Sequence, residues 1–271
     1  MRTFDSLGKK KAIIGLIHLY PMPGTPFFEE GNFERSLEKA VKDSRNLFEG
    51  GADGCLIQTV DKVYPGKDEA DYARVAAMAA ITYAVTQNVG PEFQIGVQLM
   101  WNSLHASLAI AKVCNASFIR CTALIGATMS PFGLVQADPL SLQNYRMQLQ
   151  AQNIKLIAEI EGMHFHWYGE EKPVPQIARS AAMVGAHGVE IAIADEEKSN
   201  ALVREIKMAM PNLPVILGGY TNHENAARRL KDADGAFVGT CLEKEGWGGE
   251  IDVERVKKYV EIVRNLEAKT T

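Results

Sequence analysis

Two glutamates, Glu159 and Glu161, lie two positions apart in an apolar run that predicts a β-strand. Because side chains alternate along a strand, both carboxylates fall on one face, and their repulsion is expected to raise the pKa of at least one. A raised carboxyl pKa suits a general acid or base. A second possibility is a divalent metal held by the two glutamates with His164. A third is a structural ion pair between Glu159 and Arg120 on the neighbouring strand. The pattern favours acid–base or substrate-binding chemistry, then the ion pair, and last the metal, so no cofactor is predicted.

Polar side chains also stand where other apolar runs end. His18 closes the first run, just before a proline-rich turn, and alternation places it on one face with Leu16 and Ile14. One histidine at a strand end is often structural, but many such groups converging on the mouth of a barrel indicate a site. The catalytic candidates are His18, Glu159, Glu161 and His164, and the ligand-binding candidates are Gln58, Asp61, Gln98, Asn102, Arg120 and Asp195.

A phosphate site is predicted from the glycines after the last two apolar runs. Glycine lets backbone N–H groups approach an anion, threonine adds a hydroxyl group, and (β/α)8 barrels often bind phosphate with these two loops and a helix N-terminus. We expect the N–H groups near Gly219–Tyr220 and Gly239–Thr240 to share one concavity, reinforced by the start of a helix at 222–230. The candidate phosphate-binding residues are Gly218, Gly219, Thr221, Gly239 and Thr240.

Eight apolar runs alternate with eight helix-like segments along the chain. The predicted strands are 12–19, 53–58, 93–99, 118–122, 154–161, 188–194, 214–217 and 235–238. The predicted helices are 33–50, 68–87, 103–114, 139–150, 173–184, 196–210, 222–230 and 253–266, with Asn32 and Asp138 as N-caps of the first and fourth and a long loop at 123–137. This alternation predicts one (β/α)8 TIM barrel over residues 1–271, with its first strand paired to its last. A doubly wound open sheet is disfavoured because no G-x-G-x-x-G follows the first strand.

Composition and charge limit the classes of protein that fit. The chain has 271 residues, 46% hydrophobic and 23% charged, and a net charge of −4, which argues against binding nucleic acid through phosphate neutralisation. Its four cysteines are scattered without a C-x-x-C pair, as in cytoplasmic proteins with reduced thiols. No apolar stretch is long enough to cross a bilayer. We therefore predict a cytoplasmic protein without an integral membrane segment. Two adjacent phenylalanines within Pro21–Phe28 predict a homo-oligomer.

The stretch GLIHLYPMPGTP at 15–26 resembles the G-x-x-H-L-x-P-x-P-G-x-P signature of the BtpA/SgcQ family. The resemblance covers nearly the whole chain and continues at 50–54, 95–98, 118–120 and 233–240. It implies a TIM barrel close to the ribulose-phosphate-binding barrels, and the named role of the family in cyanobacteria is the biogenesis or stability of photosystem I proteins. A divergent member is indicated by departures from the usual residues at Gln58-Thr59, Gly162-Met163-His164 and Ala194-Asp195.

Together these patterns predict a barrel that binds a small phosphorylated molecule at the C-terminal ends of its strands. Among enzymes, an isomerase, epimerase or lyase on a phosphosugar-like substrate fits best, with His18 and Glu159 for acid–base chemistry and Arg120 to orient the ligand. The alternative is a non-catalytic assembly or stability factor for a protein complex, of the photosystem I kind that the resemblance implies. An enzyme should keep a polar, concave mouth, whereas an assembly factor should expose a large apolar patch.

Overall fold

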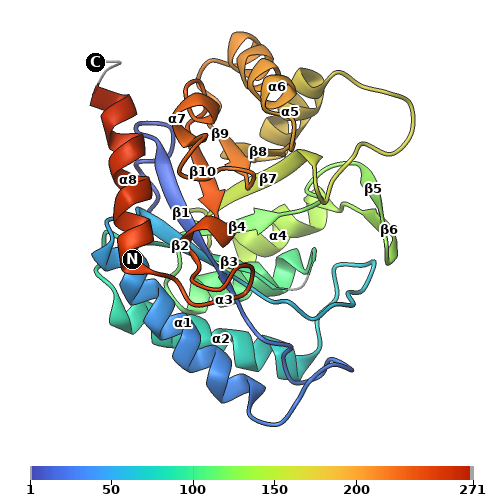
Figure 1. Cartoon of the computed structure of the whole chain (residues 1–271). Helices are drawn as coiled ribbons and strands as arrows, with labels where there is room; N and C mark the ends of the chain where they lie inside the picture. The colour runs from blue at the N-terminus through green and yellow to red at the C-terminus, as the bar shows by residue number, and fades with distance from the viewer. Residues whose placement is uncertain (1, 100, 269–271) are drawn as a thin grey trace.

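A closed barrel of eight parallel strands forms the centre of the molecule (Figure 1). The computed structural model describes residues 2–99 and 101–268. The barrel strands are β1 (Ala12–His18), β2 (Gly54–Gln58), β3 (Gln94–Gln98), β4 (Phe118–Cys121), β7 (Lys155–Gly162), β8 (Gly188–Ala192), β9 (Val215–Gly218) and β10 (Gly235–Val238). β1 pairs with β10, and Gly15 lies opposite Val238. This pairing of first and last strands confirms the predicted TIM barrel and excludes the open sheet.

Helices follow the strands in alternation and cover the outside of the barrel (Figure 1). They are α1 (Asn32–Glu49), α2 (Tyr72–Asn88), α3 (Leu104–Val113), α4 (Pro139–Gln148), α5 (Val174–Met183), α6 (Glu196–Ala209), α7 (Ala226–Arg229) and α8 (Val253–Ala268), with a short 3-10 helix, η1 (Thr240–Leu242), after β10. Asp138 caps α4 as predicted, because its carboxylate accepts the N–H of Ser141 at 2.9 Å. Among the described helices, none has the length and apolarity that crossing a bilayer requires.

The starts of two helices differ from the prediction. α1 is preceded by Gly31 with a φ of +82°, so Gly31 and not Asn32 is its N-cap. The Asn32 amide instead donates to a carbonyl of the preceding loop. α7 is much shorter than the expected 222–230, because the side chain of Asn222 accepts the N–H groups of the residues two and three positions ahead. Such local hydrogen bonds compete with helix formation and hold this segment in a turn.

Two apolar layers fix the barrel and place His18 at its mouth. Along β1, Ile13 packs outward against the helices, whereas Ile14 and Leu16 face the barrel interior. Phe4, which precedes β1, is buried in the same interior cluster. Burying each large apolar side chain contributes about 1.5–3 kcal/mol to stability. His18 continues this inward-facing column, as the period of two along the strand predicted.

The predicted loop at 123–137 contains a β-hairpin that forms one wall of the mouth. Its strands are β5 (Ala127–Ser130) and β6 (Gly133–Gln136), which pair antiparallel. Phe132 at the hairpin turn packs edge-on against Tyr64 and Trp101, with ring centroids 5.3 and 5.1 Å away. Three loops that are distant in sequence are thereby joined into one aromatic wall.

Candidate functional site

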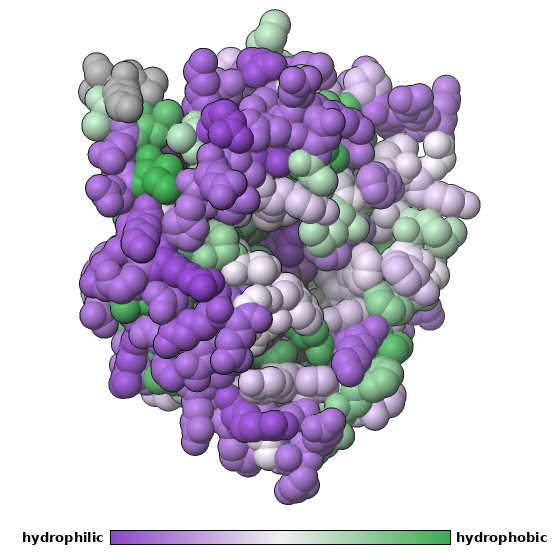
Figure 2. Space-filling view, viewed as in Figure 1, coloured by the Kyte–Doolittle hydropathy of each residue, from purple (hydrophilic) through white to green (hydrophobic). Residues whose placement is uncertain are grey.

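A cavity of about 710 Å³ opens at the C-terminal ends of the barrel strands. Figure 2 shows a hollow near the middle of this face of the molecule. The volume lies in the range typical of small-molecule sites. The predicted site residues that line it are His18, Gln58, Gln98, Arg120, His164, Gly218, Gly219, Thr221, Gly239 and Thr240.

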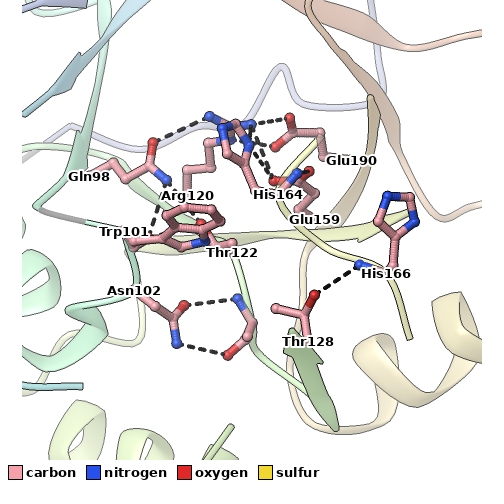
Figure 3. Close-up of polar contacts among 11 residues, drawn as sticks. Gln98, Trp101, Asn102, Arg120, Thr122, Thr128, Glu159, His164, His166 and Glu190 are labelled. Atoms are coloured by element: carbon pink, nitrogen blue, oxygen red, sulfur yellow. Dashed lines mark hydrogen bonds and ion pairs between the residues drawn. The ribbon is translucent and has the colours of Figure 1, made fainter. Parts of the chain in front are cut away.

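Arg120 of β4 forms the floor of the cavity through a buried network of charges (Figure 3). Its Nε and Nη2 donate to the two carboxylate oxygens of Glu190, each at 2.6 Å. Nη2 also lies 3.3 Å from Glu159, and Nη1 donates to Gln98 Oε1 at 3.3 Å. The ion pair between Arg120 and Glu159 was one of the predicted alternatives. The closer partner is Glu190, which the sequence analysis missed.

The two buried carboxylates beside Arg120 have opposite pKa shifts. Glu159 and Glu190 face each other across β7 and β8. Burial favours a raised pKa for Glu159, but hydrogen bonds and charge from His164 and Arg120 outweigh it and lower the pKa. Burial raises the pKa of Glu190, with the negative charge of Glu159 adding to the effect and Arg120 opposing it. The electrostatic repulsion expected between two carboxylates therefore acts between neighbouring strands, and Arg120 forms ion pairs with both carboxylates.

Glu161 lies apart from this network, contrary to the expectation that it shares a face with Glu159. The register between β7 and β8 shifts between these two residues, as in a β-bulge. Glu161 instead contacts His166 Nδ1 at 3.2 Å and does not line the cavity. The prediction was that repulsion raises the pKa of at least one of the two glutamates. For Glu159 it is wrong, because His164 and Arg120 lower the pKa of its carboxyl.

The metal alternative at Glu159, Glu161 and His164 has no supporting ligand set. Within residues 2–99 and 101–268, no group of three or more His, Cys, Asp and Glu side chains is arranged to hold a metal ion. Glu159 accepts the backbone N–H of His164 at 2.8 Å and contacts its Nδ1 at 3.1 Å. The carboxylate thus fixes the orientation of this imidazole, which reaches the cavity.

His18 is held at the opposite side of the mouth by Glu243, in the loop after η1. The His18 Nδ1 lies 2.9 Å from Glu243 Oε1, and both side chains are buried. The other oxygen of Glu243 accepts the N–H of Gly248 at 3.0 Å. Because a carboxylate can only accept, the neutral imidazole has its proton on Nδ1 and its lone pair on Nε2. Nε2 has no partner among the described residues, so this imidazole can accept a proton from a ligand.

Backbone N–H groups after β9 and β10 supply the predicted anion donors only in part. The N–H of Gly219 donates to the Phe237 carbonyl at 3.2 Å and is not available. The N–H groups of Tyr220, Gly239 and Thr240 have no acceptor among the described residues, and all three residues line the cavity. α7 contributes no residue to the lining, so the expected helix N-terminus is absent from the site.

Gly218 has a different role from the one predicted. A Cβ atom at this position would lie 1.9 Å from Glu190 Oε1 and 2.9 Å from the Cβ of Ala192. Glycine is therefore required here so that the carboxylate of Glu190 can reach Arg120.

Three of the ligand-binding candidates lie outside the cavity lining. Asp61 is buried and accepts the N–H of Met22 at 2.9 Å, which ties two mouth loops together. Asn102 makes two hydrogen bonds to the backbone of Ala123, with one donor and one acceptor (Figure 3). Asp195 is exposed and caps α6. All three use their polar atoms to fix loops around the mouth.

Comparison with known proteins agrees with this architecture. Residues 9–265 match the sequence model of the BtpA family. The chain belongs to the BtpA family. An uncharacterized protein of Archaeoglobus fulgidus is 33% identical over 255 residues, which is 93% of this chain and 98% of that protein. The photosystem I biogenesis protein BtpA of Synechocystis sp. is 27% identical over 268 residues, covering 96% of this chain and 91% of that protein.

Solved structures with the same fold include a tryptophan synthase and a phosphoribosylanthranilate isomerase. Tryptophan synthase of Mycobacterium tuberculosis superposes with a TM-score of 0.62 at 16% identity, covering 95% of this chain and 94% of that chain. N-(5'-phosphoribosyl)anthranilate isomerase of Pyrococcus furiosus gives a TM-score of 0.55 at 15% identity, covering 93% and 99%. At these identities the likeness establishes the TIM barrel fold of this BtpA-family chain.

Several residues that line the cavity of this BtpA-family chain, or hold its lining in place, were missed by sequence reasoning. Glu190 stands alone in the apolar run of β8, and a single carboxylate in such a run is a signal that it has a buried cation. Glu243 and Trp247 lie in a loop, where spacing carries no periodic signal. Trp101 and Tyr64 lie in loops, and nothing in the sequence indicates that they pack together and against Phe132 of the hairpin.

Proposed function

We propose that this BtpA-family barrel binds a small phosphorylated molecule at its mouth and moves a proton on it, as an isomerase, epimerase or lyase. One observation carries the proposal. The oriented, proton-accepting imidazole of His18 lies beside the free backbone donors that follow β10. A Cβ atom on Gly239 would lie 3.4 Å from His18 Cε1, so an anion on the N–H groups of Gly239 and Thr240 would rest next to this base.

A second imidazole stands across the mouth from the first. His18 ends β1 and His164 follows β7, and these strands lie four places apart in the eight-stranded barrel. His164 is partly exposed and is oriented by Glu159 at its back. Two imidazoles on opposite sides of one ligand suit a reaction in which one removes a proton and the other returns one. Glu159 and Glu243 then act as positioning residues, and Gln58, whose amide oxygen has no partner within the described residues, supplies a polar contact to the ligand.

The character of the mouth supports an enzyme over the alternative of an assembly factor. The cavity is concave, and its lining includes Arg120, two glutamines and two histidines. The named role of the Synechocystis relative in photosystem I biogenesis keeps the alternative open to test. The imidazole of His18, held by the buried carboxylate of Glu243 at one side of the cavity, suits catalysis and is not required for an assembly role.

The decisive test pairs ligand binding with proton transfer. We expect phosphate esters from a panel of phosphosugars and nucleotides to raise the melting temperature of the parent, since ligands stabilise the state that binds them. The active ester should exchange a carbon-bound hydrogen for solvent deuterium, followed by NMR. H18Q should still bind it but exchange about a hundredfold more slowly or worse. H166Q, a matched change at an exposed histidine outside the lining, should behave as the parent.

Two outcomes would reject the proposal. Absence of any stabilisation by phosphate esters would remove the phosphate ligand. Equal exchange rates in H18Q and the parent would remove His18 as the proton acceptor.

We also propose that the segment 21–28 joins two copies of the chain. Phe27 and Phe28 are 41% and 36% exposed at the rim of the mouth. We expect light scattering to give the mass of a homo-oligomer, and a double F27E/F28E variant to give a monomer. M208E, on the exposed side of α6, should leave the mass of the parent unchanged. A monomeric parent at high concentration would refute this interface.

A further inference from the structure

We propose that the part of the ligand beyond its phosphate is a planar heteroaromatic ring that stacks on Trp247, as in a nucleoside monophosphate. This inference rests on the proposed function for the phosphate and adds the class of substrate. The other candidate classes, phosphorylated open-chain or ring sugars, carry several hydroxyl groups instead of an aromatic ring.

The lining of the cavity is rich in rings and poor in charge. Within the described residues, no aspartate, glutamate or lysine lines it. Its one charged side chain, Arg120, is already matched by two carboxylates. The ring side chains in the lining are His18, Tyr64, Trp101, His164, Tyr220 and Trp247. Such a lining offers stacking surfaces to a flat ligand and few strong partners to a hydroxylated one.

Most polar side chains of the wall are already hydrogen-bonded within the protein. Gln98 Nε2 donates to Thr122 Oγ1 at 3.2 Å, and the hydroxyl of Thr122 donates to the Trp101 carbonyl at 2.9 Å. The hydroxyl of Tyr64 is held by the backbone of its own loop. A sugar phosphate whose sugar filled the whole cavity would leave many hydroxyl groups buried without partners, each at a cost in binding free energy.

Gln58 provides the polar contact that a heterocyclic ring needs. Its Oε1 is buried and has no hydrogen-bond partner in the described part of the chain. Gln58 lies directly opposite His18 in the β1–β2 register, and both residues line the cavity. An amide presents a donor and an acceptor in one plane, which is the arrangement that pairs with the edge of a nucleobase. The amide of Gln58 can therefore pair with one edge of a heterocyclic ring.

Trp247 offers the stacking surface and stands between two glycines on a loop beside His18. Its ring centroid lies 5.1 Å from that of His18, and its side chain is 63% exposed. The flanking Gly246 and Gly248 have φ of +90° and +85°, and no atom lies near the position of a Cβ on either. The base of the loop is fixed by the Lys244 N–H, which donates to the Glu250 carbonyl at 2.9 Å. A large ring left open to water beside a base indicates a surface that a ligand covers.

The proposed stacking surface and the proposed phosphate site lie on the same side of the mouth. Trp247, Gly239 and Thr240 all belong to the segment that follows β10. His18 contacts this segment through both Glu243 and Trp247. A ligand with phosphate on the N–H groups and its ring on Trp247 would place the atoms between them, the sugar of a nucleotide, beside His18 Nε2.

Calorimetric titration with four classes of probe tests the inference. The classes are inorganic phosphate, ribose 5-phosphate, the four common ribonucleoside 5′-monophosphates, and the corresponding nucleosides. We expect at least one nucleoside monophosphate to bind the parent tenfold or more tightly than ribose 5-phosphate. W247A should remove this advantage and leave the affinity for ribose 5-phosphate unchanged. W247F should keep most of the advantage, and Y72A, at an exposed tyrosine on α2, should keep all of it.

The outcomes separate this inference from the proposed function. If ribose 5-phosphate binds as tightly as every nucleoside monophosphate, or W247A keeps the preference, the ring site is wrong while the phosphate site stands. If nucleosides bind through Trp247 but phosphate adds nothing, the ring site stands and the phosphate proposal fails. If none of the probes binds, both are overturned.

Discussion

Replacing Arg120 by methionine should lower the free energy of unfolding by about 3–5 kcal/mol. Arg120 is the one cation in contact with two fully buried carboxylates, those of Glu159 and Glu190. Taking the cation away leaves negative charge in the barrel interior without a partner, and burial of an unpaired charge is among the most costly single changes to a protein. Methionine retains similar length, so the loss reflects charge more than volume.

The defect of R120M should depend on pH in a definite direction. In the parent, the lowered pKa of Glu159 contributes stability that is present above the ordinary carboxyl pKa and is lost as the pH falls. Without Arg120, the pKa of Glu159 in the folded state is no longer lowered by that charge, and the pKa of Glu190, already raised by burial, rises further above its unfolded value. The folded variant then binds more protons than the unfolded chain, and its stability falls as the pH rises. The difference in the free energy of unfolding between R120M and the parent should therefore be large at pH 7 and smaller near pH 5.

Urea unfolding of parent and variant at both pH values provides the measurement. R228M makes a matched control, since Arg228 pairs with Glu196 on the exposed surface and the loss of an exposed ion pair should change stability little. Neutralising both carboxylates in R120M/E159Q/E190Q should restore part of the stability. A cost in R120M equal to that in R228M, without dependence on pH, would show that the buried network does not hold the floor of the site together.

The elements that were predictable from sequence are those governed by local periodicity. Alternation along β1 placed His18 on the face of Ile14 and Leu16, and the alternation of strands and helices was enough to predict closure of β1 on β10. The network around Arg120 was not predictable, because it depends on the register between strands. Glu190 meets Glu159 only through the pairing of β7 with β8, and the bulge after Glu159 breaks the simple count of two.

Side chains that stabilise loops were also beyond reach of spacing arguments. Asp61 and Asn102 lie in the loops just beyond the strand ends at Gln58 and Gln98. Their polar atoms are occupied by backbone groups of neighbouring loops. Nothing in a strand-end position distinguishes a residue that faces the mouth from one that holds the rim. That difference follows from tertiary contacts, as does the pairing of His18 with Glu243, which is 225 residues away.

Replacing Gly239 by aspartate should abolish binding of phosphate and phosphate esters. The new carboxylate would stand where the N–H groups of Gly239 and Thr240 are expected to hold the anion. Two like charges about 4 Å apart repel by about 4 kcal/mol at an effective dielectric constant of 20, so affinity should fall by about a hundredfold or more. There is room for the new side chain, since the nearest atoms to a Cβ on Gly239, in His18 and Leu16, lie at 3.4 Å.

G239N separates charge from bulk in this experiment, because asparagine matches aspartate in size and lacks its charge. We expect calorimetry with inorganic phosphate to show weak or no binding to G239D and a much smaller loss for G239N, while both variants keep the melting temperature of the parent within a few degrees. The lining holds no lysine within the described residues, and its one cation, Arg120, is already paired with Glu159 and Glu190, so one added negative charge is not offset. A folded G239D that binds phosphate as tightly as the parent would mean that the anion site is not located after β10.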